Sequence, residues 1–321
     1  MLFPVTVVGS FPKPDYLKKA RADYENGRIT YHELMDLTRK ASEECIKYQI
    51  EAGVDIISDG EMDRGDMATF FAEKLYGFKI SGLVRSYGNR YYRKPIIIDR
   101  VKFVQPMTVE MWKFANERSG GRPVKGIFTG PYTMMDWSFD EYYGDRRKAT
   151  LDIARAMHEE AVALERAGAK YIQIDEPAVS TRPEELGLAI EANKIVTRGL
   201  KAKTIMHICY GNFKAIYPEM LKLPVDQLDL EFANRNFELL ELFKEHKYTK
   251  EVGLGVTDSH SHIIETKEQV LAGIRKALEV IPPEKIYIDS DCGLKTRTKE
   301  EAIGKLRVMV EAARELRKEF A

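Results

Sequence analysis

The sequence alternates short apolar runs with longer amphipathic stretches along its whole length. The apolar runs predict strands buried on both faces, and the stretches between them, with apolar residues every three or four positions, predict helices. The eight predicted strands are VTVVG (5–9), DIISDGE (55–61), KGIFTG (125–130), YIQIDEP (171–177), TIMHICYG (204–211), QLDLEFAN (227–234), EVGLGVTD (251–258) and KIYIDSDCG (285–293). Predicted helices cover 32–52, 148–167, 185–200, 235–246, 266–280 and 298–319. Eight strands alternating with helices predict a (β/α)₈ TIM barrel.

One interval departs from this alternation. Residues 62–124 are too many for a single crossover, and they contain strand-like pieces of their own, FKIS, RSYGNRYYRKP and IIIDRVKFV. We interpret them as an insertion between the second and third strands of the barrel, built from a hairpin and a helix. Because the sequence contains no linker and no internal repeat, we expect residues 1–321 to form one domain.

The charge balance limits the kinds of partner. The chain has 50 basic and 50 acidic residues, so its formal net charge is zero. Such a chain has no overall field to attract nucleic acid or an anionic membrane, and we expect neither as a partner. No apolar run approaches the roughly 20 residues that cross a bilayer, and the start lacks the pattern of a signal peptide. We therefore expect a cytoplasmic protein.

The three cysteines, Cys45, Cys209 and Cys292, are too few for a disulfide framework in a reducing compartment. Metal binding and packing are the remaining explanations. Cys45 lies on an apolar stripe of the predicted helix 32–52, together with Ala41 and Tyr48. We interpret Cys45 as a core residue, which leaves the other two for a metal.

A metal site is indicated by the pair His207 and Cys209. Side chains two residues apart on a strand share one face, so both can reach the same ion. Glu231 and Cys292 follow at the ends of two later predicted strands. Imidazole and thiolate ligands suit Zn²⁺. Structural zinc sites usually use closely spaced pairs, whereas the separations here are 2, 22 and 61 residues and need a preformed scaffold.

The charge of this ligand set indicates the chemistry. Two thiolates and one carboxylate leave Zn²⁺ with a net charge of minus one, which makes it a weak Lewis acid for activating water. A metal does deprotonate a coordinated thiol, so we expect a substrate sulfur to bind the ion, displace Glu231 and attack an electrophilic carbon. A zinc hydrolase would use mostly His and carboxylate ligands. A noncatalytic, metal-stabilised binding subunit is a further alternative, which metal removal would distinguish.

Polar residues also follow the other predicted strands. They are Ser10, Glu61, Thr129, Asp175, and the pair Asp258 and His260. In a barrel the C-terminal ends of all strands gather at one mouth, which is where barrel enzymes place their sites. We therefore expect these residues to surround the metal ligands.

Nine motifs, spread in order over essentially the whole chain, carry a family resemblance. They are GSFP, DGEMDRGDM, SYGNRYYRKP, TGPYTMMDWSF, QIDEPA, MHICYG, EFANRNFELLE, GVTDSHS and DCGLKTR, with the strand-end residues between them. The chain resembles the C-terminal catalytic barrel of cobalamin-independent methionine synthase. It is similar to the short core form that lacks the N-terminal domain of the long enzymes.

The resemblance implies a role for individual residues. It places the zinc ligands on His207, Cys209, Glu231 and Cys292, the set reached above from strand geometry. The implied homocysteine site is Gly9, Ser10, Glu61 and Asp175; the donor-binding residues are Arg90, Tyr91 and Trp137; and the catalytic proton donor is His260, beside Asp258. One acidic position of the family, six residues after Asp175, is occupied here by Thr181.

The expected reaction is methyl transfer to the thiol of L-homocysteine, forming L-methionine. For the short form the resemblance implies a methylcorrinoid donor, either methylcobalamin or a corrinoid protein, and a methyl-tetrahydropterin or folate donor is the alternative. Transfer to another thiol such as coenzyme M would make no use of Glu61 and Asp175 facing an ammonium group. Lys295 and Arg297 either contact an anionic donor or offset the negative charge of the site.

Overall fold

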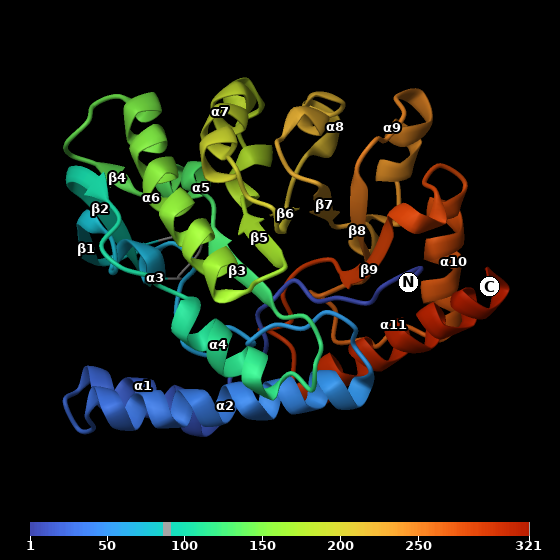
Figure 1. Ribbon diagram of the computed structural model, residues 1–321, viewed down its shortest axis with the longest axis horizontal. Helices are drawn as coiled ribbons and strands as arrows, with labels where there is room; N and C mark the ends of the chain where they lie inside the picture. The colour runs from blue at the N-terminus through green and yellow to red at the C-terminus, as the bar shows by residue number, and fades with distance from the viewer. Residues whose placement is uncertain (86–90, 321) are drawn as a thin grey trace. The chain divides into compact units, whose positions relative to one another are not determined.

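The computed structural model describes residues 1–85 and 91–320, with only the backbone of Tyr91 (Figure 1). The chain forms two compact units. The first consists of Met1–Asp63, Met111–Lys125 and Gln227–Ala321, and the second of Arg64–Glu110 and Gly126–Asp226. Each unit joins segments that are far apart in the sequence, and the expectation of a single domain stays a prediction.

Six of the eight predicted strands belong to a parallel sheet. They are β3 (Lys125–Thr129), β5 (Tyr171–Asp175), β6 (Lys203–Ile208), β7 (Gln227–Leu230), β8 (Glu251–Thr257) and β9 (Ile286–Ser290), in the order β3-β5-β6-β7-β8-β9. Nearly every residue of these strands is buried. Burial on both faces explains why the strands are continuous apolar runs instead of alternating ones.

The other two predicted strands are present as single parallel bridges in the first unit. Val5 pairs with Ile288 of β9, and Ile57 pairs with Val124. The two segments are joined to each other, because the N–H groups of Asp55 and Ile56 donate to the carbonyl of Val5 at 3.0 and 3.1 Å. These contacts supply the two remaining strand positions. The fold is the (β/α)₈ TIM barrel expected from the sequence.

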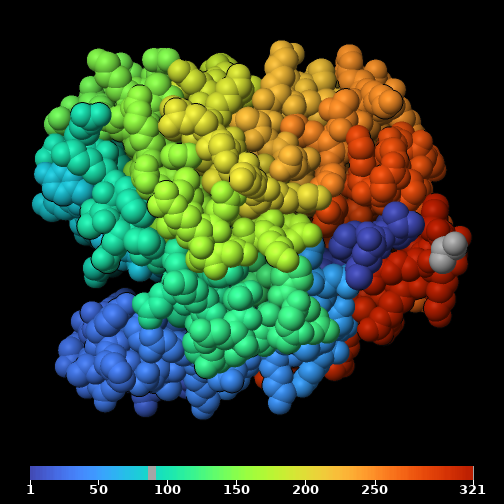
Figure 2. Space-filling model, in the orientation of Figure 1, coloured from blue at the N-terminus to red at the C-terminus, as the bar shows by residue number. Residues whose placement is uncertain are grey.

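Four helices of the first unit follow predicted amphipathic stretches: α2 (Tyr31–Ala52), α9 (Leu239–Glu245), α10 (Lys267–Leu278) and α11 (Lys299–Glu319). The unit also contains α1 (Asp15–Glu25), which was not predicted, and most of α4 (Val109–Arg118), which belongs to the insertion. Capping boxes at Thr30, Thr266 and Thr298 fix the first turns of α2, α10 and α11. The blue helices α1 and α2 lie side by side and form a continuous surface (Figures 1 and 2).

The second unit contains the crossover helices α5 (Pro131–Asp136), α6 (Arg146–Ala167), α7 (Leu186–Val196) and α8 (Phe213–Ile216). The insertion predicted at residues 62–124 contributes α3 (Thr69–Ala72), β1 (Tyr76–Arg85) and β2 (Tyr91–Lys102) to this unit. β1 and β2 pair antiparallel, and β4 (Phe139–Asp140) adds to β2 in parallel. The expected hairpin and helix, the latter being α4, are therefore both present between the second and third barrel strands.

The two ends of the chain meet in the first unit. Arg317, near the end of α11, donates to the carbonyls of Leu2 and Phe3 at 2.9 and 2.8 Å and pairs with Asp55. In Figure 2 the dark blue N-terminal residues lie against the red atoms of α11. Among the helices of residues 1–85 and 91–320, none combines the length and the apolar character needed to cross a membrane.

Candidate active site

His207 and Cys209 lie at the C-terminal end of β6. His207 is 3% exposed and Cys209 is 5% exposed. In the parallel pairing of β5 with β6, Asp175 is the register partner of His207. The predicted substrate carboxylate and the first predicted metal ligand therefore end neighbouring strands at the same level.

The structure groups His207 and Cys209 with Cys292, which follows β9. One ligand atom from each of the three residues lies within 4.8 Å of the others. Such a separation lets three donor atoms coordinate a single ion, because zinc–nitrogen and zinc–sulfur bonds are about 2.0–2.3 Å long. Three of the four predicted ligands are thus brought together.

Glu231, the fourth predicted ligand, lies directly after β7 and is 1% exposed. It is not part of the three-residue group. Its Oε2 accepts a hydrogen bond from Asn234 Nδ2 at 3.0 Å, whereas Oε1 accepts none from the described residues and lies 3.8 Å from Arg235 Nε. A buried carboxylate oxygen with no hydrogen bond is costly unless a cation compensates it. Its role as a ligand stays a prediction.

Asp291 holds the loop that follows Glu231. Its carboxylate accepts the backbone N–H groups of Phe232, Ala233 and Asn234 at 2.7, 2.9 and 2.7 Å. Gly255 of β8 leaves room for it, since a Cβ there would lie 2.4 Å from Asp291 Oδ1. Burial raises the pKa of Asp291 to about 8, against the three donors, which lower it. Asp291 thereby links the segment of Cys292 to the segment of Glu231.

The predicted amino-acid site at Gly9, Ser10 and Glu61 is built from two loops of the first unit. Ser58 Oγ donates to the carbonyl of Gly9 at 2.7 Å, and the N–H of Phe11 donates to the carbonyl of Gly60 at 3.1 Å. Glu61 has a φ of 54°, a left-handed conformation that is uncommon outside glycine. Its N–H donates to Asp59 Oδ1 at 2.8 Å, which stabilises this turn.

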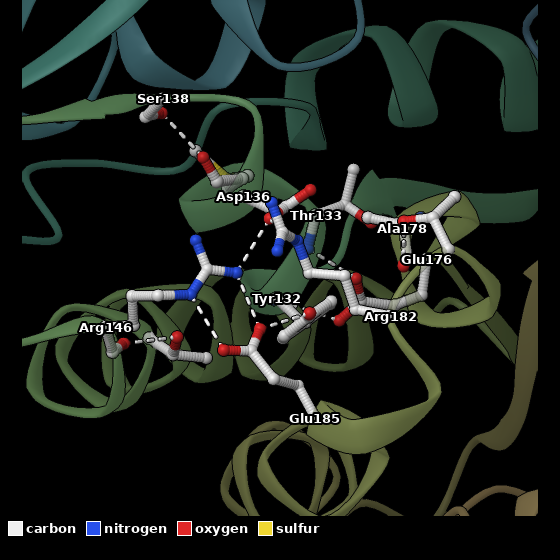
Figure 3. A network of polar contacts seen from close by, with 12 residues as sticks. Tyr132, Thr133, Asp136, Ser138, Arg146, Glu176, Ala178, Arg182 and Glu185 are labelled. Carbon is white, nitrogen blue, oxygen red and sulfur yellow. Dashed lines mark hydrogen bonds and ion pairs between the residues drawn. The ribbon is translucent and has the colours of Figure 1, made fainter.

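Asp175, at the end of β5, is 9% exposed and its Oδ1 accepts from Gln173 Nε2 at 2.8 Å. The next residue, Glu176, is fully buried and accepts the N–H groups of Tyr132 and Thr133 at the start of α5, at 3.1 and 2.7 Å (Figure 3). Burial is the main reason why the pKa of Glu176 is raised. Glu176 therefore fixes the position of α5 relative to the strand end that carries Asp175.

A second carboxylate stabilises the other end of this network. Glu185 accepts from Tyr132 Oη at 2.5 Å and from both Nε and Nη2 of Arg146, at 2.9 and 2.6 Å (Figure 3). The pKa of Glu185 is lowered, chiefly by its hydrogen bonds to Arg146. Together, Glu176 and Glu185 hold α5, whose C-cap residue is the predicted donor-stacking residue Trp137.

Of the predicted donor-binding residues, Trp137 is half-buried, and its backbone N–H donates to the carbonyl of Thr133 at 2.9 Å. Arg90 lies outside the described residues, and Tyr91 is described only as the first backbone position of β2. These assignments stay predictions.

The predicted catalytic pair lies in the loop after β8. His260 is exposed, and its backbone N–H donates to Asp258 Oδ1 at 2.8 Å. Glu265 Oε1 accepts the N–H of Asp258 at 2.7 Å, while its Oε2 accepts from the buried Lys305 Nζ at 2.8 Å. An ion pair between the buried Lys305 of α11 and the half-buried Glu265 therefore fixes the loop that presents His260.

Comparison with known proteins decides the family. The model of the catalytic domain of cobalamin-independent synthase matches residues 3–315. The chain belongs to this family.

Relatives of this family match over almost their whole length. The chain is 40% identical to a methionine synthase from Saccharolobus solfataricus over 319 residues, which cover 99% of this chain and 96% of the relative. A solved B12-independent methionine synthase from Shewanella sp. W3-18-1, in complex with selenomethionine, is 30% identical with a TM-score of 0.88, covering 100% of this chain and 99% of the other. A methyltransferase from Methanosarcina mazei shares the fold at 16% identity, with a TM-score of 0.67 over 98% and 94% of the two chains.

These matches confirm the family resemblance, the barrel and the expectation of a methyltransferase of the methionine synthase type. They do not support the expected methylcorrinoid donor, because the cobalamin-independent synthase family is defined by the absence of that cofactor from the reaction. The alternative, a methyl-tetrahydropterin or folate donor, fits the family better. The sequence argument failed at this point because it took the short chain length as an indication of the donor.

Two residues with clear positions in the site were not singled out from the sequence. Asp291 and Glu176 each stand next to a predicted site residue, Cys292 and Asp175, at the end of a buried strand. A buried acid beside a ligand is a signal for a residue that orients its neighbours.

Proposed function

We propose that this protein transfers a methyl group from a methyl-tetrahydropterin or folate to the thiol of L-homocysteine, forming L-methionine. The observation that carries the proposal is the group of His207, Cys209 and Cys292, whose ligand atoms lie within 4.8 Å of one another. Among family members this reaction is supported by the curated name methionine synthase and by a relative solved with selenomethionine, an analogue of the product.

The residues present fit a zinc ion. Two thiols and an imidazole are a soft donor set, and Glu231 adds a buried carboxylate oxygen that accepts no hydrogen bond from the described residues. We assign His207, Cys209, Glu231 and Cys292 to hold it. When bound, zinc lowers the pKa of a coordinated thiol so that the thiolate forms at neutral pH.

The remaining predicted residues would orient homocysteine. The N–H groups and hydroxyl at Gly9 and Ser10 suit the carboxylate of the amino acid, and the carboxylates of Glu61 and Asp175 suit its ammonium group. The backbone of Glu61 is held by its N–H bond to Asp59, and the carboxylate of Asp175 is held by Gln173. A thiol substrate without an ammonium group would leave two carboxylates unused, which favours homocysteine over coenzyme M.

Methyl transfer to sulfur forms a sulfur–carbon bond and breaks the bond between the methyl carbon and a nitrogen of the donor. The electron pair stays on that nitrogen, which then takes up a proton. A nitrogen leaving group needs a general acid, and we assign this role to His260, on the loop fixed by Asp258, Glu265 and Lys305. Trp137 would stack on the pterin ring, together with Arg90 and Tyr91.

The test is an assay of the purified, zinc-loaded protein with homocysteine and one methyl donor at a time. Methionine is expected with methyl-tetrahydrofolate or another methyl-tetrahydropterin, and not with methylcobalamin. Coenzyme M replaces homocysteine in a parallel reaction. Product from methylcobalamin alone, or methylation of coenzyme M in preference to homocysteine, would contradict the proposal. The cytoplasmic location stays a prediction.

A further inference from the structure

Lys305 is a charged residue on the buried face of α11. The other buried side chains of this helix are apolar, among them Ala302, Leu306 and Met309. The side chain of Lys305 is 0% exposed, so its ammonium group has no contact with water. Apolar residues in place of a buried ion pair are often neutral or stabilising, and such a pair is therefore weak evidence of a role in stability. The contacts of Lys305 indicate a different role.

The Lys305 ammonium group donates to two residues of the loop that follows β8. Nζ donates to the carbonyl of Ile263 at 2.6 Å and to Glu265 Oε2 at 2.8 Å. The other oxygen of Glu265 accepts the backbone N–H of Asp258 at 2.7 Å. Because Asp258 and Glu265 lie at the two ends of the loop, this one carboxylate closes the loop, and Lys305 holds the carboxylate.

The same chain of hydrogen bonds reaches His260. Asp258 Oδ1 accepts the backbone N–H of His260 at 2.8 Å. His260 is exposed, yet three successive bonds connect its backbone to the interior of α11. A proton donor must lie within hydrogen-bond reach of the atom that receives the proton. The orientation of the loop therefore decides whether His260 can act.

Two further contacts join this loop to the same side of α11. His262 Nδ1 lies 2.9 Å from Glu301 Oε1, and Ile264 packs against Gly304, where a Cβ would collide with its side chain. Glu301, Gly304 and Lys305 are three and four residues apart, so they share one side of the helix. His262 is 73% exposed, and exposed pairs contribute little. The buried contact of Lys305 is therefore the principal anchor of the loop.

We propose that Lys305 is a positioning residue for methyl transfer, which acts through Glu265 and Asp258 on the proton donor His260. The inference rests on the proposed function, in which the donor nitrogen keeps the electron pair of the broken bond and takes a proton from His260. Lys305 supplies no group to this step. It holds the loop in the conformation from which His260 delivers the proton, and the burial of its charge serves the reaction more than folding.

The first experiment separates catalysis from stability. Lys305→Met leaves Glu265 without its cation, so the double variant Lys305→Met/Glu265→Leu, which removes both charges, decides if circular dichroism shows that the single variant does not fold. Lys318→Met, at an exposed position of the same helix, is the matched control. Both Lys305 variants should lower kcat for methyl transfer at least about tenfold, because a small displacement of a reacting group has effects of this size. KM for homocysteine and the zinc content should equal those of Lys318→Met.

The second experiment tests whether the effect passes through His260. kcat is measured for His260→Gln, for the folded Lys305 variant and for the two changes combined. His260→Gln is expected to lower kcat about 100-fold, the lower end of general acid catalysis. The combined variant should be no slower than His260→Gln alone, because the effects of residues that act as a unit do not multiply. Multiplied effects, or the wild-type kcat in the folded Lys305 variant, would overturn the inference.

The third measurement does not depend on turnover. Hydrogen exchange of the zinc-loaded protein reports the opening of residues 258–266. Exchange in this segment should be severalfold faster in the Lys305 variants than in Lys318→Met, because the N–H groups of Asp258 and His260 lose protection. Unchanged exchange beside a slow His260→Gln variant refutes this inference alone. A His260→Gln variant with the wild-type kcat refutes the proton donor of the proposed function, and this inference with it.

Discussion

The carboxylate of Asp291 accepts the backbone N–H of Phe232 at 2.7 Å. Asp291 precedes Cys292 and Phe232 follows Glu231, so one hydrogen bond joins the segments of two predicted zinc ligands. Two further bonds, from the N–H groups of Ala233 and Asn234, extend the contact. The geometry of the ligand set therefore depends on a residue that is not itself a predicted ligand.

Asp291→Asn is expected to weaken zinc binding by about 10- to 100-fold, the usual effect of losing a residue that orients metal ligands. The amide can accept at one oxygen only, and its NH₂ group would face a backbone donor. Competition with a chromophoric chelator measures the affinity. Asp145→Asn is the control, because Asn is an equally good N-cap for α6. Unchanged zinc affinity in Asp291→Asn would show that the loop after Glu231 needs no such anchor.

Cys292→Ser and Cys45→Ala should separate the two kinds of cysteine. Cys292→Ser is expected to lose zinc and to reduce methyl transfer by more than about 100-fold. The barrel should stay folded, because ligands so far apart in the sequence need a scaffold that forms without the metal. Cys45→Ala should keep one zinc per chain and its activity, since Cys45 is fully buried in the core. Zinc content by atomic absorption, with circular dichroism, distinguishes them. Loss of zinc from Cys45→Ala would contradict this division.

The buried Cys45 thiol also predicts an alkaline effect. Burial raises the pKa of Cys45 from 9.0 to about 12. Between these values the unfolded chain releases the thiol proton and the folded protein keeps it, so the free energy of unfolding should fall by about 1.4 kcal/mol per pH unit. Cys45→Ala should lack this contribution. Urea unfolding of both proteins from pH 8 to 11 measures the free energy of unfolding at each pH. If the two plots of this free energy against pH are parallel, the thiol makes no contribution.

Asp175→Asn is expected to raise KM for homocysteine about 10- to 100-fold, because a charge-assisted hydrogen bond to an ammonium group contributes about 1.5–3 kcal/mol. The turnover number at saturating homocysteine should change much less. Asp140→Asn, on the exposed strand β4, is the control. Steady-state kinetics with homocysteine as the varied substrate gives both constants, and a KM like that of the wild type would remove Asp175 from the substrate site.

Lys13→Gln should stabilise the ligand-free protein by about 2 kcal/mol at pH 7, since it removes a desolvated ammonium group. Below pH 8 Lys13 is charged in both states and destabilises the folded state fully. As pH rises from about 8 to 10.5 the folded protein loses the proton first, so the difference between variant and wild type should disappear. Denaturant unfolding of both proteins at pH 7 and pH 10.5 measures this difference in the free energy of unfolding. A variant less stable than the wild type at pH 7 would contradict the desolvation argument.

Much of the fold follows from local pattern. The predicted helix at 148–167 is present as α6 (Arg146–Ala167), and its end at Gly168 is a left-handed C-cap. The limits of the first two barrel strands were harder to predict, because in each of these segments the structure has a single isolated bridge, at Val5 and at Ile57, in place of a longer strand. Helix α1 was not predicted, since its sequence DYLKKARADYE is mostly polar and buries little apart from Leu17 and Ala20.

The site was predictable where chemistry depends on residue type. His207, Cys209 and Cys292 were identified because thiols and imidazoles are few in this sequence, and the structure groups them. Glu176 and Asp291 could not be distinguished in the same way among 50 acidic residues. Their roles depend on which backbone N–H groups face them, and strand periodicity does not determine that.

The contact of Arg317 with Leu2 and Phe3 has a consequence for biosynthesis. On a translating ribosome Leu2 is made 315 residues before Arg317, so its carbonyl cannot meet this guanidinium until residue 317 has left the exit tunnel. Domain-sized chains of this kind complete their tertiary contacts late. Until then the nascent chain must keep this segment, with the buried Phe3 and Val5, from aggregating.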